Sequence, residues 1–171
     1  MEKLHDSIEI HRGITATKCP FTKHFKGFNR IDVVRRIFGL KATETLDKLM
    51  LEFTRDTLYL RVDNTDGHLL VNPDYFLEGN ATDIYLDAIH ELVHVKQFMD
   101  GKRSCEHVNY VERPLEIEAY GVAVGEARIL GLREDRILEY LGSELVKNED
   151  LVNLAKTLEV NNDELTAECG N

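Results

Sequence analysis

The sequence has no tryptophan and only three cysteines and three prolines among 171 residues. Three scattered cysteines (Cys19, Cys105 and Cys169) are odd in number and do not form the disulfide framework of a small secreted domain. No apolar run approaches the roughly 20 residues that span a bilayer. The first ten residues are charged from the second residue on and show no apolar signal core. We therefore expect a cytoplasmic protein with no membrane partner.

Positive charge is also scarce. The sequence contains 21 Lys and Arg but 31 Asp and Glu, which gives a net charge of −10. This excess opposes binding to nucleic acid and to anionic membranes, so we expect neither as a partner. The apolar fraction of 43% and charged fraction of 30% are typical of a globular protein. The length favours a single domain, divided into an N-terminal segment (1–30), a core (31–131) and a C-terminal helical extension (132–171). The oligomeric state is left open.

Hydrophobic periodicity predicts an α+β fold with a small sheet. A basic stretch, residues 17–26, has phenylalanines at near-helical spacing, and we interpret it as a segment packed over the core rather than a nucleic-acid site. A loop is expected over 74–80. The other predicted elements are helices over 31–40, 43–55, 84–99, 115–130, 134–145 and 150–158, and a hairpin with strands at 57–63 and 68–72.

The motif His90-Glu91-Leu92-Val93-His94 lies inside the predicted helix 84–99. Residues four apart share one face of a helix, so His90 and His94 can direct two imidazoles at one metal ion. Glu91 lies about 100° around the helix from His90, where it can reach a water molecule beside that ion. This pattern is the zinc-peptidase signature H-E-x-x-H.

A catalytic zinc ion takes three protein ligands, so a third ligand is expected downstream. Two carboxylates, Glu116 and Glu118, lie in the first turn of the helix 115–130. Glu118 shares a face with Leu115, Val122 and Ile129, and a carboxylate on an apolar stripe is costly unless it is paired or bound to metal. We therefore expect Glu118 to be the third ligand. Glu116 is the alternative, because amphipathicity alone does not separate the two.

His90-Glu-Leu-Val-His94, followed by a helix that opens with Glu116-Ile-Glu118-Ala119, resembles the gluzincin zinc peptidases. Its short cytosolic members, the minigluzincins and the peptidases that act beside phage-type repressors, are the most similar in size. The resemblance covers residues 57–130 and implies a zincin-like domain, a Zn²⁺ cofactor and a peptide or protein substrate. The chain lacks the third histidine of metzincins and a clear asparagine-glutamate motif of the thermolysin kind.

The chemistry of such a zinc site also suggests roles for single residues. Zinc lowers the pKa of its bound water, and Glu91 would be the general base that takes the proton during attack on a peptide bond. Tyr110 or His107 would stabilise the oxyanion. Gln97 lies one turn further along the face of the histidines and could hydrogen-bond one of them, although we favour an exposed side chain there. The substrate would add as a strand along residues 68–72.

Other functions stay open. One is a catalytically silent zincin-like module that binds metal and a partner, and another is an accessory protein of a transcriptional regulator. Retention of Glu91 favours the peptidase, because a purely structural metal site has no use for a general base.

Overall fold

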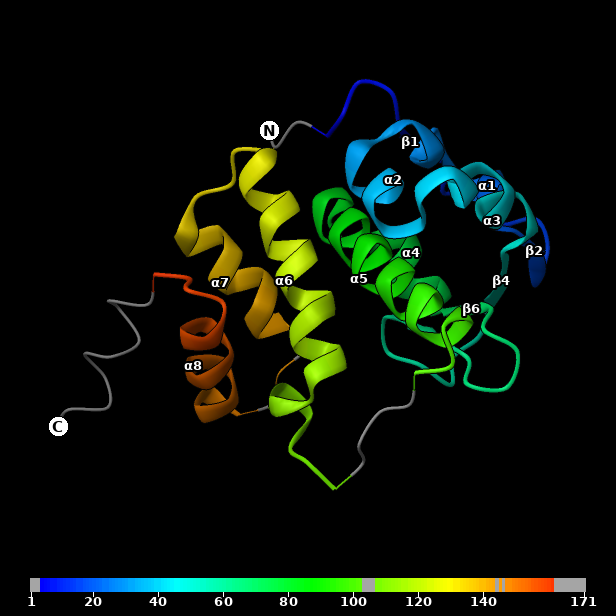
Figure 1. The fold of residues 1–171 in the computed structure, drawn as a ribbon. Helices are drawn as coiled ribbons and strands as arrows, with labels where there is room; N and C mark the ends of the chain where they lie inside the picture. Colours follow the sequence, from blue (N-terminus) through cyan, green and yellow to red (C-terminus); the bar gives the residue numbers. More distant parts are fainter. Residues whose placement is uncertain (1–3, 103–106, 144, 146, 162–171) are drawn as a thin grey trace, which may run out of the picture. The chain divides into compact units, whose positions relative to one another are not determined.

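The computed structural model describes residues 4–102, 107–143, 145 and 147–161. The chain divides into two compact units, Met1–Arg103 and Ser104–Asn171. Helices and small sheets are both present, so the predicted α+β class is confirmed (Figure 1). The predicted core, residues 31–131, includes parts of both units. The last ten residues, which belong to the predicted C-terminal extension, lie outside the described residues.

The first unit opens with short elements packed by aromatic rings. Phe21, Phe25 and Phe28 are almost completely buried. The rings of Phe21 and Phe25 stack at 4.6 Å between centroids, and Phe28 meets both edge-on. The interpretation of residues 17–26 as a segment packed over the core is therefore confirmed. These elements are β1 (Glu9–Ile10), β2 (Lys18–Pro20), α1 (Phe21–His24), β3 (Phe25–Lys26) and the 3₁₀ helix η1 (Phe28–Arg30).

The main sheet of this unit has four strands in the order β2-β4-β6-β5. Its later strands are β4 (Met50–Phe53), β5 (Leu60–Val62) and β6 (Leu69–Val71). β5 and β6 pair antiparallel, which confirms the predicted hairpin. β6 also pairs with β4, in parallel, so both of its edges are occupied. The expectation that a substrate strand adds along residues 68–72 is therefore wrong, because that strand has no free backbone edge.

The helix predicted over 43–55 is present in its first half only, and the second half of this range forms a strand. α3 (Ala42–Lys48) ends at Leu49, whose ψ of 127° is extended, and β4 follows. Alternation of Leu51 and Phe53, both buried, with half-buried Glu52 fits a strand, and β2 and β6 supply its ladder hydrogen bonds. The helix predicted over 31–40 is present as α2 (Asp32–Phe38), followed by the 3₁₀ helix η2 (Gly39–Lys41).

The loop predicted over 74–80 is also wrong, because a short helix, α4 (Pro73–Glu78), occupies most of it. Pro73 fits the first helical position, where no N–H is needed. The side chain of Asn72 accepts hydrogen bonds from the backbone N–H groups of Asp74 and Tyr75, at 2.9 and 3.0 Å. The asparagine cap and the proline that follows it therefore start a helix here.

The long helix α5 (Ala81–Met99) is buried along most of its length. The side chain of Asn80 caps its N-terminus by accepting a hydrogen bond from the backbone N–H of Thr82 at 2.8 Å. α5 packs against α2 and β5. The hydroxyl of Tyr75 on α4 donates to Asp87 of α5, which is 4% exposed. The helix that carries the motif is thus held from several sides by its own unit.

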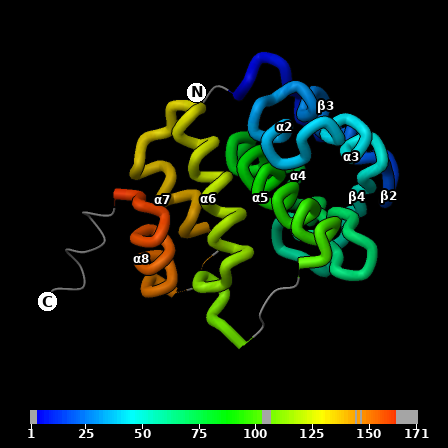
Figure 2. Tube along the Cα trace, viewed as in Figure 1, coloured from blue at the N-terminus to red at the C-terminus, as the bar shows by residue number. Residues whose placement is uncertain are grey.

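The second unit is helical. It comprises η3 (Tyr110–Glu112), α6 (Pro114–Ile129), α7 (Glu134–Ser143) and α8 (Asn148–Thr157). α7 and α8 pack against each other, and Figure 2 traces the chain from α6 through both. Pro114 starts α6, one residue before the predicted range 115–130. Among the described residues, no helix combines the length and apolar character needed to cross a bilayer.

Candidate metal site on helix α5

His90 and His94 lie one turn apart on α5, and their imidazoles converge as the i,i+4 spacing predicts. Their Nε2 atoms are 3.0 Å apart. His90 is 3% exposed, and His94 is half-buried. Two imidazole nitrogens at this separation can be ligands of one cation.

Gln97 fixes the orientation of His94. Its side-chain oxygen lies 2.7 Å from Nδ1 of His94, and Gln97 itself is 3% exposed. Because an amide oxygen only accepts, Nδ1 of His94 carries the proton and donates it. The lone pair of Nε2 is then left on the side that faces His90. Gln97 is therefore buried and hydrogen-bonded to His94, whereas the sequence favoured an exposed side chain.

Glu91 is buried beside this pair of histidines. The side chain is 7% exposed, and its Oε1 lies 3.9 Å from Nε2 of His90. A carboxylate so close to the converging nitrogens is placed to accept a proton from a water molecule next to a bound ion.

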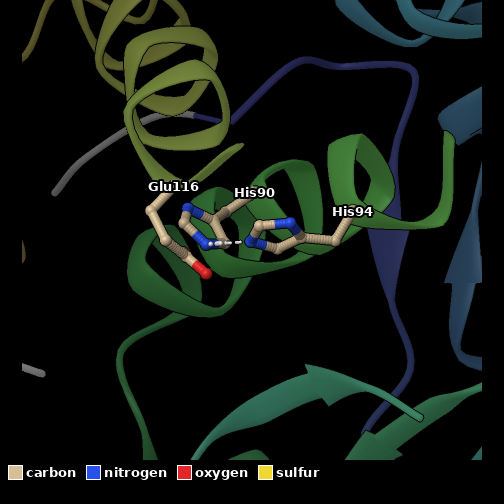
Figure 3. Close-up of side chains that lie close together, drawn as sticks. All are labelled: His90, His94 and Glu116. Atoms are coloured by element: carbon tan, nitrogen blue, oxygen red, sulfur yellow. Dashed lines mark hydrogen bonds between the residues drawn. The ribbon is translucent and has the colours of Figure 1, made fainter. Parts of the chain in front are cut away.

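Glu116 joins the two histidines in a group that could hold a metal ion. Each of the three residues offers one ligand atom, and these atoms all lie within 4.8 Å of one another (Figure 3). Glu116 is 8% exposed. The favoured residue, Glu118, is exposed and is not part of this group. The group therefore contains Glu116, the alternative third ligand, and not the favoured Glu118.

The two residues proposed for the oxyanion, Tyr110 and His107, are both exposed. Tyr110 lies in η3, and its hydroxyl is 3.5 Å from that of Tyr120. Neither residue belongs to the metal-capable group. Their predicted roles stay predictions.

The donor set fits a zinc ion. Zinc prefers imidazole nitrogen and carboxylate oxygen in a tetrahedral arrangement with bonds of about 2.0–2.2 Å, which separates ligand atoms by roughly 3.3 Å. The Nε2 atoms of His90 and His94, both in the first unit, are 3.0 Å apart, which is close to that spacing. Three protein ligands leave the fourth position for water or substrate, as in catalytic rather than structural zinc sites.

A second metal-capable group among the described residues, Asp63, Asp66 and His68, lies in the turn between β5 and β6. The polar atoms of this group form hydrogen bonds within the turn. Asp63 accepts from the N–H and hydroxyl of Thr65, and Asp66 binds the backbone N–H and the ring of His68. Of the cysteines, Cys19 is buried with its thiol pKa raised by desolvation, and Cys105 lies outside the described residues.

No protein-family model, curated protein or solved structure matches this chain, so its own geometry carries the functional argument.

Proposed function

We propose that this protein is a zinc-dependent peptidase with a zincin-like domain, in which His90, His94 and Glu116 hold the ion and Glu91 is the general base. The observation that carries the proposal is the buried Glu91 carboxylate 3.9 Å from Nε2 of His90, where that nitrogen meets Nε2 of His94. A metal site that only supports a fold needs no such carboxylate.

The order of elements supports the same proposal. The β5–β6 hairpin, the histidine helix α5 and the glutamate helix α6 follow one another as in the gluzincins that the motif resembles. The identity of the third ligand changes from Glu118 to Glu116 in this proposal, because Glu116 is buried and belongs to the metal-capable group.

When bound, zinc would supply Lewis acidity and a water molecule of lowered pKa. Glu91 would accept the proton of the attacking water and deliver it to the leaving amine of the peptide. His94, held by Gln97, keeps its Nε2 lone pair free on the side that faces His90, and this lone pair would bind the ion. The burial of His90 and Glu91 limits the water around both groups, which strengthens their electrostatic interactions.

The test is digestion of a peptide library by the full chain loaded with zinc. We expect cleavage by the unmodified protein and a loss of at least about 100-fold in Glu91→Gln, which removes the base but no ligand. Glu78→Gln is the matched control, because it makes the same change at an exposed position on α4 of the same unit. It should cleave like the unmodified protein.

Two outcomes would contradict the proposal. Zinc bound without any cleavage would identify a silent metal-binding module. Undiminished cleavage by Glu91→Gln with its zinc retained would remove Glu91 as the base.

A further inference from the structure

Charge is distributed unevenly along the chain. Residues 12–48 contain nine Lys and Arg but only three Asp and Glu, although the whole chain has a net charge of −10. The segment begins just after β1 and runs through α3. A local excess of cations makes the potential near this segment more positive than the net charge of the chain suggests, which favours anions there.

A hollow with a volume of about 510 Å³ lies on this basic segment. That volume is within the range of about 300–1,000 Å³ found for small-molecule sites. Its lining combines two guanidinium groups, a side-chain amide, a hydroxyl, two apolar side chains and a glycine, from Arg30, Arg35, Asn29, Thr43, Leu40, Ala42 and Gly39.

The two arginines of the hollow are available for a ligand. Arg30 and Arg35 are exposed, and the described residues provide no ion pair or hydrogen bond to either side chain. Several lysines of the same segment are engaged instead. Lys26 pairs with Glu9 at 3.5 Å, and Lys48 pairs with Glu44 at 2.6 Å.

The other polar groups add donors at the same place. Nδ2 of Asn29 donates to Oγ1 of Thr43 at 3.3 Å, which holds the amide and the hydroxyl next to each other. Two guanidinium groups, an amide and a hydroxyl offer more donors than the two oxygens of a carboxylate accept. A phosphoryl group has three acceptor oxygens and up to two negative charges, and arginine binds it in a bidentate manner.

We propose that this hollow binds a phosphoryl group carried by a small molecule or a lipid headgroup. Leu40, which is fully exposed at the hollow, would contact an apolar part of the same ligand. A long nucleic acid is disfavoured, because it would extend from the basic segment over a chain that is otherwise strongly acidic.

The test is titration calorimetry of the full chain with pyrophosphate, alongside sedimentation with phosphatidylcholine vesicles that do or do not contain phosphatidic acid. We expect saturable binding of pyrophosphate, of the phosphatidic acid vesicles, or of both. Arg30→Gln and Arg35→Gln should each weaken it about tenfold or more, as expected for a lost charge-assisted hydrogen bond. Pyrophosphate alone would indicate a small-molecule ligand, and vesicles alone would indicate a lipid.

Arg36→Gln is the matched control, because Arg36 is the neighbour of Arg35 on α2, is exposed and does not line the hollow. It should change binding by less than about twofold. An equal loss in Arg36→Gln would overturn the proposal, because binding would then follow the general field. Binding of neither probe, or citrate binding as tightly as pyrophosphate, would also overturn it. Binding that disappears in His90→Ala would place the anion on a metal ion instead and equally contradict the hollow.

Discussion

The hydrogen bond between Gln97 and His94 decides which nitrogen of the imidazole is free for a ligand. The distance of 2.7 Å and the burial of Gln97 make this contact the most direct support that a histidine of the candidate site receives from its own helix. Residues that hold a ligating histidine in this way typically contribute 10–100-fold to metal affinity.

We predict that Gln97→Leu weakens zinc binding by about tenfold or more, because Nδ1 of His94 loses its acceptor and the ring loses its fixed orientation. Gln97→Glu keeps an acceptor and should bind zinc at least as tightly as the unmodified protein. Competition with a chromophoric chelator measures both affinities. Equal weakening in the two variants would show that packing, and not the hydrogen bond, orients His94.

His24 is a buried histidine that the proposed chemistry does not use. It is completely buried, Nδ1 donates to the carbonyl of His11 at 2.6 Å, and its ring meets Phe53 and Phe76 edge-on. Nε2 has no hydrogen-bond partner among the described residues. Burial lowers the pKa of His24, nearby Lys23 and His11 lower it further, and the hydrogen bond to His11 opposes them.

The lowered pKa predicts a loss of stability on acidification. The unfolded chain takes up a proton near the usual histidine pKa of about 6.5, whereas folded His24 stays neutral until a lower pH. The contribution of His24 to the free energy of unfolding should therefore be complete above about pH 6.5 and should decrease as the pH falls below that value. The slope of this decrease is at most about 1.4 kcal/mol per pH unit. Urea unfolding at several pH values, with a chelator present, measures this slope.

His24→Asn should flatten that slope, because asparagine does not titrate. His107→Asn is the control, since His107 is exposed, and it should keep the slope of the unmodified protein. The assignment fails if His24→Asn and the unmodified protein lose stability in parallel.

The choice between Glu116 and Glu118 shows what the sequence could and could not predict at this scale. The two histidines and Glu91 follow from helical spacing. The apolar stripe that favoured Glu118 includes Ile129, which is 58% exposed, whereas Tyr120, Ala123 and Ala127 on the face of Glu116 are buried. On α6, the face with small and aromatic residues is therefore buried, whereas the face with aliphatic residues is more exposed. Small residues permit the close approach of neighbouring backbone.

At the scale of elements, α5 depends on the cap at its start. The side chain of Asn80 accepts from the backbone N–H groups of Thr82 and Asp83, at 2.8 and 3.4 Å. We predict that Asn80→Ala lowers the free energy of unfolding by about 1 kcal/mol. Asn80→Asp keeps the acceptor and should cost less. Urea unfolding measures both, and an unchanged midpoint in Asn80→Ala would mean that packing alone fixes the start of α5.

The sequence predicted long elements well and short ones poorly. The helices α5, α6, α7 and α8 were each predicted, because sustained periodicity identifies them. β4 was assigned to a helix because Leu46, Leu49 and Phe53 also fit a helical stripe over a few turns. Only its pairing with β2 and β6, which are distant in sequence, makes it a strand.

At the scale of the whole molecule, two sites of opposite preference are proposed. Imidazole and carboxylate ligands centred on α5 suit a divalent cation, and the basic segment 12–48 suits an anion. The net charge of −10 did not predict where either site lies, because a sum over the whole chain does not show how positive and negative residues are distributed along it. The placement of Arg30 and Arg35 at one hollow comes from the turn between η1 and α2 and from the path into α3.

The central claim is that His90, His94 and Glu116 hold one zinc ion, and metal binding by the full chain and two matched variants tests it most directly. Zinc content measured by mass spectrometry, with affinity from chelator competition, should give about one tightly bound ion in the unmodified protein. Glu116→Ala should weaken binding by at least about tenfold, while Glu118→Ala, an exposed neighbour two residues away, should leave it unchanged. No bound zinc, or a loss in Glu118→Ala that spares Glu116→Ala, would contradict the account.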